Sequence, residues 1–362
     1  MNPPSRSGTP AGHLGAYALI GAVVAIFALA FGYVGGWLTP HRITPQHLVD
    51  QLQTNSGGAF PGYRRNHAKG VCVTGSFQSS GQAAMYSVAQ VFAPGERTPV
   101  VGRFAIPGGD PYAPDDSVPI RSMALRFTLA DGQQWRTGMN DMPVFPVSTP
   151  AAFYQFLQSQ QPDPATGKPD PRRVGAFFGS HPETAAFLAW VKTARPSASF
   201  ATESYWSLDA FVLVDGNGRR HAVRWRMVPE NPVGDVANRA GPDYLAADLR
   251  QRLAQAPLRW HLQITLAQPG DPIDDATKEW PADRRSIDAG TVELTRTEPQ
   301  QSGPCRDINY DPMVLPHGIE ASGDPLLPAR SAAYADSYLR RTSEEAHLPG
   351  TGSARNKPDS RS

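Results

Sequence analysis

The chain has 362 residues, of which 40% are hydrophobic, and this is enough for one large domain or two small ones. Its 34 basic and 33 acidic residues leave a formal net charge of +1. This balance gives no electrostatic case for binding nucleic acid or an acidic polymer, so we expect no nucleic-acid partner.

The first predicted element is an uncharged apolar segment, residues 14–38, which follows a Pro/Ser/Gly-rich tail at residues 1–13. A membrane helix needs about 20 apolar residues, and Tyr33 and Trp37 lie near the far end, where amphipathic rings favour the membrane interface. We predict an uncleaved single-pass anchor. The alternative is a signal peptide cleaved after Ala28-Leu29-Ala30, but the apolar run is longer than the roughly 7–15 residues of a signal core.

The flanking charges do not orient this segment, because Arg6 lies on one side and Arg42 on the other. A single N-terminal anchor followed by one large domain commonly exports that domain. We therefore expect an inner-membrane protein whose domain, residues 39–345, lies in the periplasm. The polar residues 346–362 are expected to form a disordered tail.

After a brief helix at 47–53, short apolar segments alternate with turns, and Asp131-Gly132 and the segment 215–218 are hairpin signals. The predicted strands are 71–77, 84–92, 99–106, 122–129, 135–139, 142–147, 211–214, 221–227 and 260–266. The predicted helices are 149–159, with Thr149 as N-cap and Pro150 at N1, then 182–193, 244–255 and 328–341. Strand runs interrupted by helices predict an α+β fold with a β core.

The two cysteines, Cys72 and Cys305, form no CxxC pair and no zinc-type cluster with histidine. Two free thiols are the preferred interpretation. A disulfide is the alternative if the domain lies outside the cytoplasm.

Two segments carry residues suited to chemistry. His67 lies among Arg64, Arg65 and Lys69, cations that should keep its imidazole neutral and available as a base. Arg330 and Tyr334 share one face of the last predicted helix, where an arginine favours the phenolate, a known but uncommon ligand of haem iron. Taken singly, these segments also fit an exposed basic loop and an ordinary helix with a half-buried tyrosine.

Taken together and in order, the motifs resemble the haem catalase family, most closely its short members, the membrane-anchored bacterial catalase-related peroxidases. Six matches cover roughly residues 60–341. They are Arg64 with His67-Ala68-Lys69-Gly70, Thr98-Pro99 with Arg103-Phe104, Asn140 with Pro143-Val144-Phe145 and Phe153, Glu279-Trp280-Pro281, Asn309-Tyr310-Asp311-Pro312 with Gly318-Ile319, and Arg330 with Tyr334, Asp336-Ser337 and Arg341.

The resemblance implies a catalase-like antiparallel β-barrel with peripheral helices, and a haem site, with haem b as the expected type. It implies Tyr334 as the axial iron ligand and His67 and Asn140 as the catalytic residues. The implied cofactor-binding residues are Arg64, Arg103 and Arg341 at the propionates, Phe145 and Phe153 at the ring, and Arg330, supported by Asp324, beside the phenolate.

The implied function is a haem peroxidase that reduces hydrogen peroxide or small organic peroxides with a small organic electron donor, through a ferryl porphyrin-radical intermediate. Four positions depart from the family pattern. Ala105 lacks the serine hydroxyl that orients the distal histidine, Asn66 and Pro119 alter the access channel, and Asp209 stands where the proximal side usually has a histidine. These departures favour peroxidase over catalase activity, with weak catalase activity retained.

Other interpretations stay open at this point. The chain could be a true catalase, or an enzyme like allene oxide synthase that acts on lipid hydroperoxides, which also has a polar residue at the position of Asn66. Two non-enzyme interpretations are a haem-binding sensory module and an exported β domain without cofactor. The sequence also admits an oligomer.

Overall fold

The computed structural model describes residues 11–35, 38, 43–232 and 241–347. Most of the two predicted tails, 1–13 and 346–362, lies outside the described residues, as do Arg6, Trp37 and Arg42. The chain divides into two units, Met1–Thr44 and Pro45–Ser362, which are considered separately.

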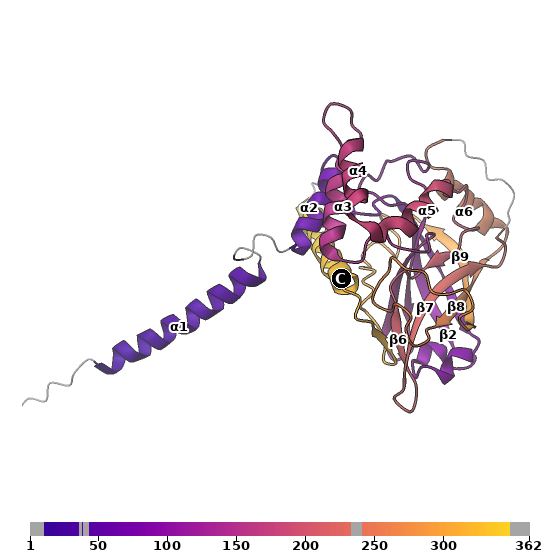
Figure 1. Ribbon diagram of the computed structural model, residues 1–362. Helices are drawn as coiled ribbons and strands as arrows, with labels where there is room; N and C mark the ends of the chain where they lie inside the picture. The colour runs from indigo at the N-terminus through magenta and orange to yellow at the C-terminus, as the bar shows by residue number, and fades with distance from the viewer. Residues whose placement is uncertain (1–10, 36–37, 39–42, 233–240, 348–362) are drawn as a thin grey trace, which may run out of the picture. The chain divides into compact units, whose positions relative to one another are not determined.

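The described residues of the first unit form one helix, α1 (Ala11–Val34), in the segment predicted to be apolar (Figure 1). Its stretch Gly15–Val34 is long and apolar enough to cross a membrane, a test that a signal sequence also passes. The large apolar side chains from Tyr17 to Val34 are exposed, so this is not a buried core helix.

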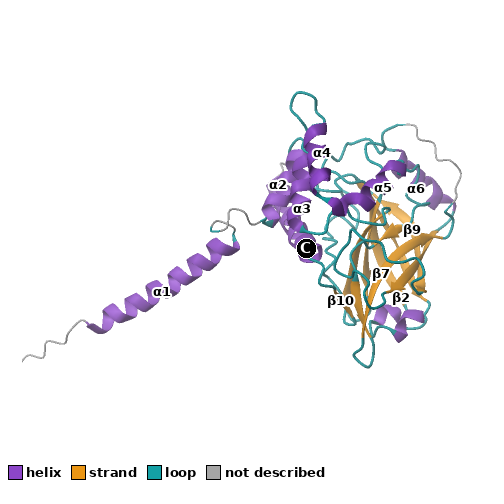
Figure 2. Cartoon of the chain, in the orientation of Figure 1, coloured by secondary structure: helices purple, strands orange, loops and turns teal. Residues whose placement is uncertain are grey.

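The second unit is built on an antiparallel sheet (Figure 2). Its described strands follow the order β10-β6-β7-β5-β4-β3-β2-β1-β9-β8. A further pairing between β7 and β8 closes the run from β7 to β8 into a barrel, and β6 and β10 extend from β7. The strands are β1 (Gly70–Ser79), β2 (Arg97–Ala105), β3 (Ser122–Thr128), β4 (Gln134–Asn140), β5 (Tyr205–Trp206), β6 (Phe211–Val214), β7 (Arg220–Pro229), β8 (Leu258–Leu266), β9 (Ser286–Glu298) and β10 (Ile319–Ala321). The predicted antiparallel barrel is confirmed.

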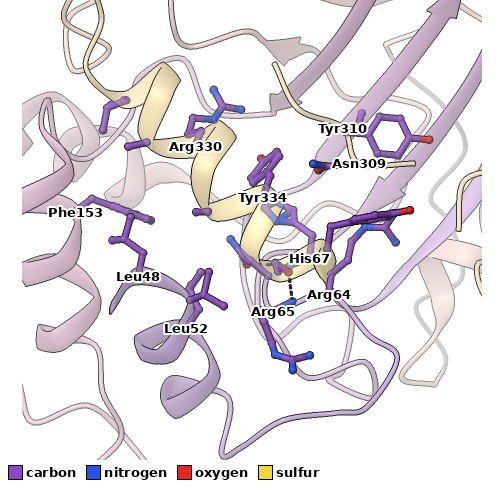
Figure 3. Close-up of a pocket in the computed structure, with 18 of the residues that line it drawn as sticks. Leu48, Leu52, Arg64, Arg65, His67, Phe153, Asn309, Tyr310, Arg330 and Tyr334 are labelled. Atoms are coloured by element: carbon purple, nitrogen blue, oxygen red, sulfur yellow. Dashed lines mark hydrogen bonds between the residues drawn. The ribbon is translucent and has the colours of Figure 1, made fainter. Parts of the chain in front are cut away.

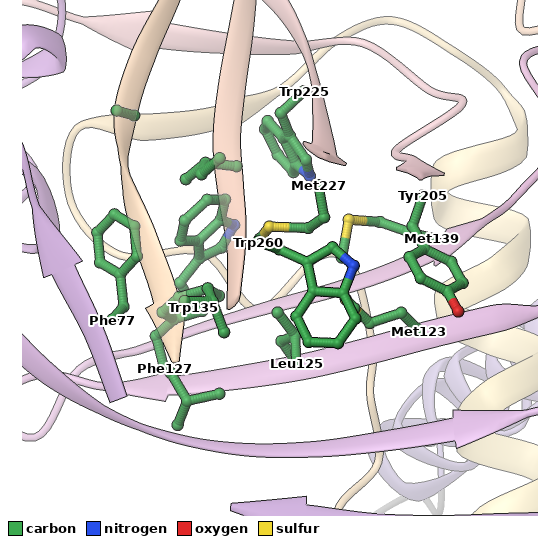
Figure 4. Close-up of a cluster of buried hydrophobic side chains, with 14 of the residues drawn as sticks. Phe77, Met123, Leu125, Phe127, Trp135, Met139, Tyr205, Trp225, Met227 and Trp260 are labelled. Atoms are coloured by element: carbon green, nitrogen blue, oxygen red, sulfur yellow. The ribbon is translucent and has the colours of Figure 1, made fainter. Parts of the chain in front are cut away.

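Large side chains fill the barrel interior (Figure 4). The rings of Phe127 and Trp135 stack with centroids 4.6 Å apart, and those of Phe211 and Trp225 stack at 4.2 Å. Alternate residues of a strand point to opposite faces of the sheet. Since one face is filled by this core, any site must lie on the outer wall or at the ends of the barrel.

Helices cover part of that outer wall, and α2 packs against both α3 and α7. Thr149 caps α3 by accepting a hydrogen bond from the Ala152 amide at 3.1 Å, with Pro150 in the first turn, as predicted. The helices are α2 (Pro45–Asn55), α3 (Pro150–Ser159), α4 (Pro171–Ser180), α5 (Ala185–Thr193), α6 (Tyr244–Gln255), α7 (Leu326–His347) and the short 3₁₀ helices η1 (Gln82–Met85), η2 (Gln90–Phe92) and η3 (Pro182–Thr184).

Two strand predictions are wrong. Residues 84–92 form η1 and η2 rather than a strand, and 142–147 have no regular structure because Pro143 and Pro146 cannot donate to a ladder. Four elements, β5, β9, β10 and α4, were not predicted. In β9 the buried residues are the odd-numbered Ile287 and Ala289 before Gly290 and the even-numbered Val292 and Leu294 after it. This shift breaks the alternation by which a strand is predicted.

The two cysteines form a disulfide, which corrects the preference for free thiols. Cys72 in β1 and Cys305 have Cα atoms 5.4 Å apart although they are separated by 233 residues. Sequence spacing carries no information at this separation, because only the folded barrel brings the two segments together.

Candidate active site

A cavity lies between the outer wall of the barrel and helices α2, α3 and α7 (Figure 3). Eight of the nine predicted site residues line it: Arg64, His67, Asn140, Phe145, Phe153, Arg330, Tyr334 and Arg341. The ninth, Arg103, is buried beside it and donates to the carbonyl of Ala68, the residue after His67, at 3.2 Å.

Strand periodicity explains how β3 and β4 contribute to this wall. Met123 and Leu125 of β3 point into the barrel core, so Ser122 and Ala124 face outward. Likewise Met139 of β4 points inward, and Asn140 faces the cavity. The polar residues of the site are therefore outward positions of core strands, which makes their backbone rigid.

His67 lies in a left-handed backbone conformation, with a φ of 57°. Such a conformation is uncommon for a residue other than glycine and clusters at functional sites. The Asn66 side-chain oxygen holds it, because it accepts from the His67 amide at 2.9 Å and from the Gly108 amide at 2.8 Å. Asn66 was predicted only as a residue that alters the access channel, and the structure adds this second role.

The His67 imidazole is neutral at physiological pH. Burial, followed by the charges of Arg103 and Arg64, lowers its pKa to about 3. This confirms the expectation that neighbouring cations keep the ring unprotonated, although burial is the larger cause.

A serine hydroxyl does contact the imidazole, although Ala105 removes the one expected. Ser122 Oγ lies 2.9 Å from His67 Nε2 and donates to Asn140 Oδ1 at 2.6 Å. The expectation that loss of the hydroxyl at Ala105 weakens the support of His67 is therefore not met, because Ser122 supplies another hydroxyl. Ser122 was missed because a serine at the start of a predicted strand is an ordinary surface pattern. Only the alternation of residues along β3 could have indicated that its side chain faces outward from the barrel.

Tyr334 and Arg330 project from successive turns of α7 and line the same cavity (Figure 3). Arg330 forms an ion pair with Asp209, donates to the Gly138 carbonyl at 3.3 Å and is hydrogen-bonded to Tyr334. Burial opposes the guanidinium charge, but Asp209 and Tyr334 outweigh it and raise the pKa of Arg330. The side chains thus form a partly buried chain from carboxylate to guanidinium to phenol.

Asp324 does not take the role expected of it. Its Oδ1 accepts from the Leu326 amide at 2.9 Å at the start of α7, and Asp209 instead forms the ion pair with Arg330. Burial, followed by the negative charge of Asp209, raises the pKa of Asp324 to about 7. The two carboxyl groups therefore differ, since Asp209 is paired with a cation and Asp324 favours its protonated form.

Arg64, Arg103 and Arg341 form a cationic cluster in which Arg103 and Arg341 are buried and Arg64 is half-buried. Burial and the charge of Arg341 lower the pKa of Arg64 to about 10, and burial and Arg64 lower that of Arg103. Within the described ranges, Nε of Arg103 and Nε of Arg341 have no hydrogen-bond partner. Mutually repelling guanidinium groups with unused donors are suited to bind carboxylates.

The remaining walls of the cavity are apolar. Phe145 and Phe153 lie with ring centroids 5.3 Å apart, and Leu48 and Leu52 of α2 approach from beside them (Figure 3). The whole lining therefore fits a flat apolar group with two carboxylates at one end and a metal facing an oxygen ligand, which is the chemistry of haem. The α2 residues were not among the predicted site residues.

Other predicted motif residues support the site or lie outside it. Ser331 of α7 donates to Asp311 at 2.7 Å and so anchors the helix to the segment containing Asn309 and Tyr310, which line the cavity. The guanidinium carbon of Arg224 lies 4.8 Å from the ring centroid of Trp280. Trp280 is absent from the cavity lining, so its role is structural.

Comparison with known proteins gives a consistent result. A family model described as Catalase matches residues 37–350. A catalase-related peroxidase of Synechococcus elongatus is 38% identical over 90% of this chain and 95% of its own length. One of Mycolicibacterium paratuberculosis is 31% identical over 83% of this chain and 95% of its own length.

Solved structures agree in fold. A bacterial catalase superimposes with a TM-score of 0.69 at 23% identity and covers 83% of this chain. Catalase A from Saccharomyces cerevisiae gives a TM-score of 0.68 at 22% identity and covers 77%. The chain spans only 61% of the length of each of these two proteins.

Proposed function

Because the chain belongs to the catalase family, we propose that it is a haem peroxidase that reduces hydrogen peroxide or small organic peroxides with a small organic electron donor. The observation that carries this proposal is one cavity that brings together two different groups of residues. Tyr334, backed by Arg330 and Asp209, lines it together with the neutral pair His67 and Asn140.

The residues that would hold haem are those of the cationic cluster and the apolar walls. Arg64, Arg103 and Arg341 would bind the propionates, and Phe145 and Phe153 would pack against the ring. Tyr334 would ligate the iron. When bound, haem supplies the electrons that cleave the peroxide O–O bond.

The proximal residues place a positive charge beside the Tyr334 oxygen. Arg330 is fixed between the carboxylate of Asp209 and the phenol, so its charge would stabilise an anionic oxygen ligand on the iron. An anionic oxygen ligand stabilises higher oxidation states of iron, which peroxide reduction needs.

The distal residues move a proton without changing the net charge of the site. His67 is neutral, so it can take a proton from one peroxide oxygen and return it to the other. Asn140 is a neutral donor that can orient the peroxide. Its Oδ1 already accepts from Ser122, which leaves the amide NH₂ for the substrate.

Peroxidase activity is proposed over catalase activity for two reasons. The relatives that this chain covers over 95% of their length are named catalase-related peroxidases. Asn66 and Pro119 also replace residues of the narrow channel that family resemblance assigns to catalases. Donor oxidation requires only access to the haem edge.

The test uses the full chain, purified in detergent and loaded with haem, with hydrogen peroxide and an oxidisable dye in one vessel. Peroxide loss, dye oxidation and oxygen release are followed together. We expect dye oxidation with little oxygen. Oxygen in dismutation stoichiometry with little dye oxidised would make the protein a true catalase. A rearranged epoxide from a lipid hydroperoxide would favour the allene-oxide-synthase alternative.

We also propose that α1 is an uncleaved inner-membrane anchor with the haem domain in the periplasm. The exposed apolar helix and the disulfide between Cys72 and Cys305 support this, because disulfides persist in oxidising compartments. Protease added to spheroplasts should degrade the domain, and detection of the N-terminus in the mature protein should show that α1 is retained. Protection from protease would contradict the orientation.

A further inference from the structure

Ser122 occupies a central position on the distal wall. In the sheet register it lies opposite Ala105 of β2 on one side and opposite Asn140 of β4 on the other. It is 5% exposed and faces outward from the barrel, as does Ala124, which lines the cavity. The sheet register therefore places the Ser122 hydroxyl between His67 and Asn140.

The hydrogen bonds of Ser122 determine where the protons lie. A serine hydroxyl has one proton to donate and lone pairs to accept with. Ser122 gives its proton to Asn140 Oδ1 at 2.6 Å, an oxygen that can only accept. The second contact, 2.9 Å to His67 Nε2, is a hydrogen bond only if that nitrogen carries the proton.

We propose that Ser122 is a positioning residue of the distal site, which holds His67 as the Nε2–H tautomer and fixes the amide orientation of Asn140. The nitrogen Nδ1 is then the only proton acceptor of the neutral imidazole. The same hydroxyl directs the Asn140 NH₂ group away from Ser122. This inference rests on the proposed function, because it assigns the proton acceptor of that same site.

The local backbone shows why such a residue is needed. His67 lies in a strained left-handed conformation in a loop. The hydrogen-bond partner of its side chain, Ser122, lies in a different element, strand β3. Removing the Ser122 hydroxyl would leave the imidazole free to change rotamer and tautomer. It would also leave Asn140 Oδ1 without its buried donor.

The experiment compares the wild type with Ser122→Ala and Ser122→Thr in the full chain, loaded with gallium(III) protoporphyrin as a diamagnetic substitute for ferric haem. Nitrogen-15 NMR of labelled histidine reports the tautomer directly, and a His67→Asn spectrum assigns the His67 signals among those of the nine histidines. We expect a protonated Nε2 and an unprotonated Nδ1 in the wild type, averaged signals in Ser122→Ala, and recovery in Ser122→Thr.

Iron-loaded protein gives the second readout. The rate constant for reaction with peroxide should fall about 10-fold in Ser122→Ala, the scale of losing a hydrogen-bonded support of a site residue. Ser79→Ala is the matched control, since Ser79 is a buried serine of β1 that is also 5% exposed and is absent from the cavity lining. It should leave both readouts unchanged.

Three outcomes would overturn the proposal. A wild-type imidazole protonated at Nδ1 would show that the serine donates to the histidine instead. An unchanged tautomer in Ser122→Ala would show that another group sets it. An equal loss in Ser79→Ala would indicate a general packing effect. If the wild type holds the Nε2–H tautomer but reacts with peroxide no faster than free haem, the proposed function fails while the positioning role stands.

Discussion

On one side of the cavity, Tyr334 and Arg330 come from a single helix, whereas on the other side His67, Ser122 and Asn140 come from a loop and two strands. The helical side is charged, since Arg330 is ion-paired with Asp209. The other side is joined by hydrogen bonds between neutral groups. The residues that would support the iron ligand therefore carry fixed charge. The residues that would move a proton in both directions are neutral.

The largest effect should come from replacing the phenol itself. In Tyr334→Phe the cavity keeps its shape but has no anionic oxygen for the iron, so we expect peroxide activity to fall to that of free haem. The haem absorption spectrum should also lose its phenolate character. Tyr86→Phe, a tyrosine buried in the barrel core, is the matched control. A wild-type-like spectrum in Tyr334→Phe would remove this residue as the ligand.

The distal counterpart is His67→Ala. Loss of a positioned acid–base group costs about 10³-fold, so the rate of peroxide reaction should fall by that order. Haem should stay bound with an unchanged ligand, because the proximal chain is intact. Stopped-flow kinetics and the absorption spectrum measure the two effects. Turnover that survives in His67→Ala but not in Tyr334→Phe would mean that the distal side has no acid–base role. His261→Ala, a histidine hydrogen-bonded to Asp288, is the control.

A smaller effect is expected from the ion pair behind the ligand, and Asp209→Asn tests whether the pairing of Arg330 with Asp209 affects the haem through Tyr334. Asp209→Asn keeps the size of the side chain but removes the partner of Arg330, so the guanidinium charge on the phenolate is less fixed. We expect about a 10-fold loss of peroxide activity and a shifted haem reduction potential. Asp215→Asn, a substitution at the aspartate paired with His221, is the control. An unchanged potential would show that Arg330 acts without Asp209.

The smallest effect is a pH dependence of stability. Burial and the charge of Asp209 raise the folded pKa of Asp324 to about 7 from an ordinary value of 3.8. The folded state therefore binds a proton that the unfolded state releases, so this contribution to stability is present at low pH and is lost as pH rises towards 7. Asp324→Asn should remove that loss, which is at most about 1.4 kcal/mol per pH unit.

Denaturation of the wild type and of Asp324→Asn at pH 4.5, 5.5 and 6.5 would measure the difference in their free energies of unfolding. Asp141→Asn is a useful comparison, since burial also raises the pKa of Asp141 to about 7 but its carboxylate accepts from the Arg121 amide, away from Arg330. Both variants should flatten the pH dependence, and only Asp324→Asn should perturb the proximal haem spectrum. A difference between wild type and Asp324→Asn that does not vary with pH would contradict the raised pKa.

The proximal side was more readily predicted than the distal side. Arg330 and Tyr334 lie four residues apart, so helical periodicity alone places them together. The distal contacts join residues 67, 122 and 140, and no local pattern relates a loop residue to the outward positions of two strands. The family resemblance implied Asp324 as the partner of Arg330, but Asp209, which is distant in sequence, forms the ion pair.

Sequence alone determined the elements whose signals are local: the apolar helix, most strands and hairpins, the Thr149 cap, and the ordered motifs that resemble one family. Tertiary structure decided the closure of the barrel, the pairing of Cys72 with Cys305, and the bridge that Ser122 makes. The physical reason is that hydrophobic period and capping act over a few residues. Disulfides, ion pairs and shared protons instead depend on which distant segments the closed sheet brings within a few ångströms.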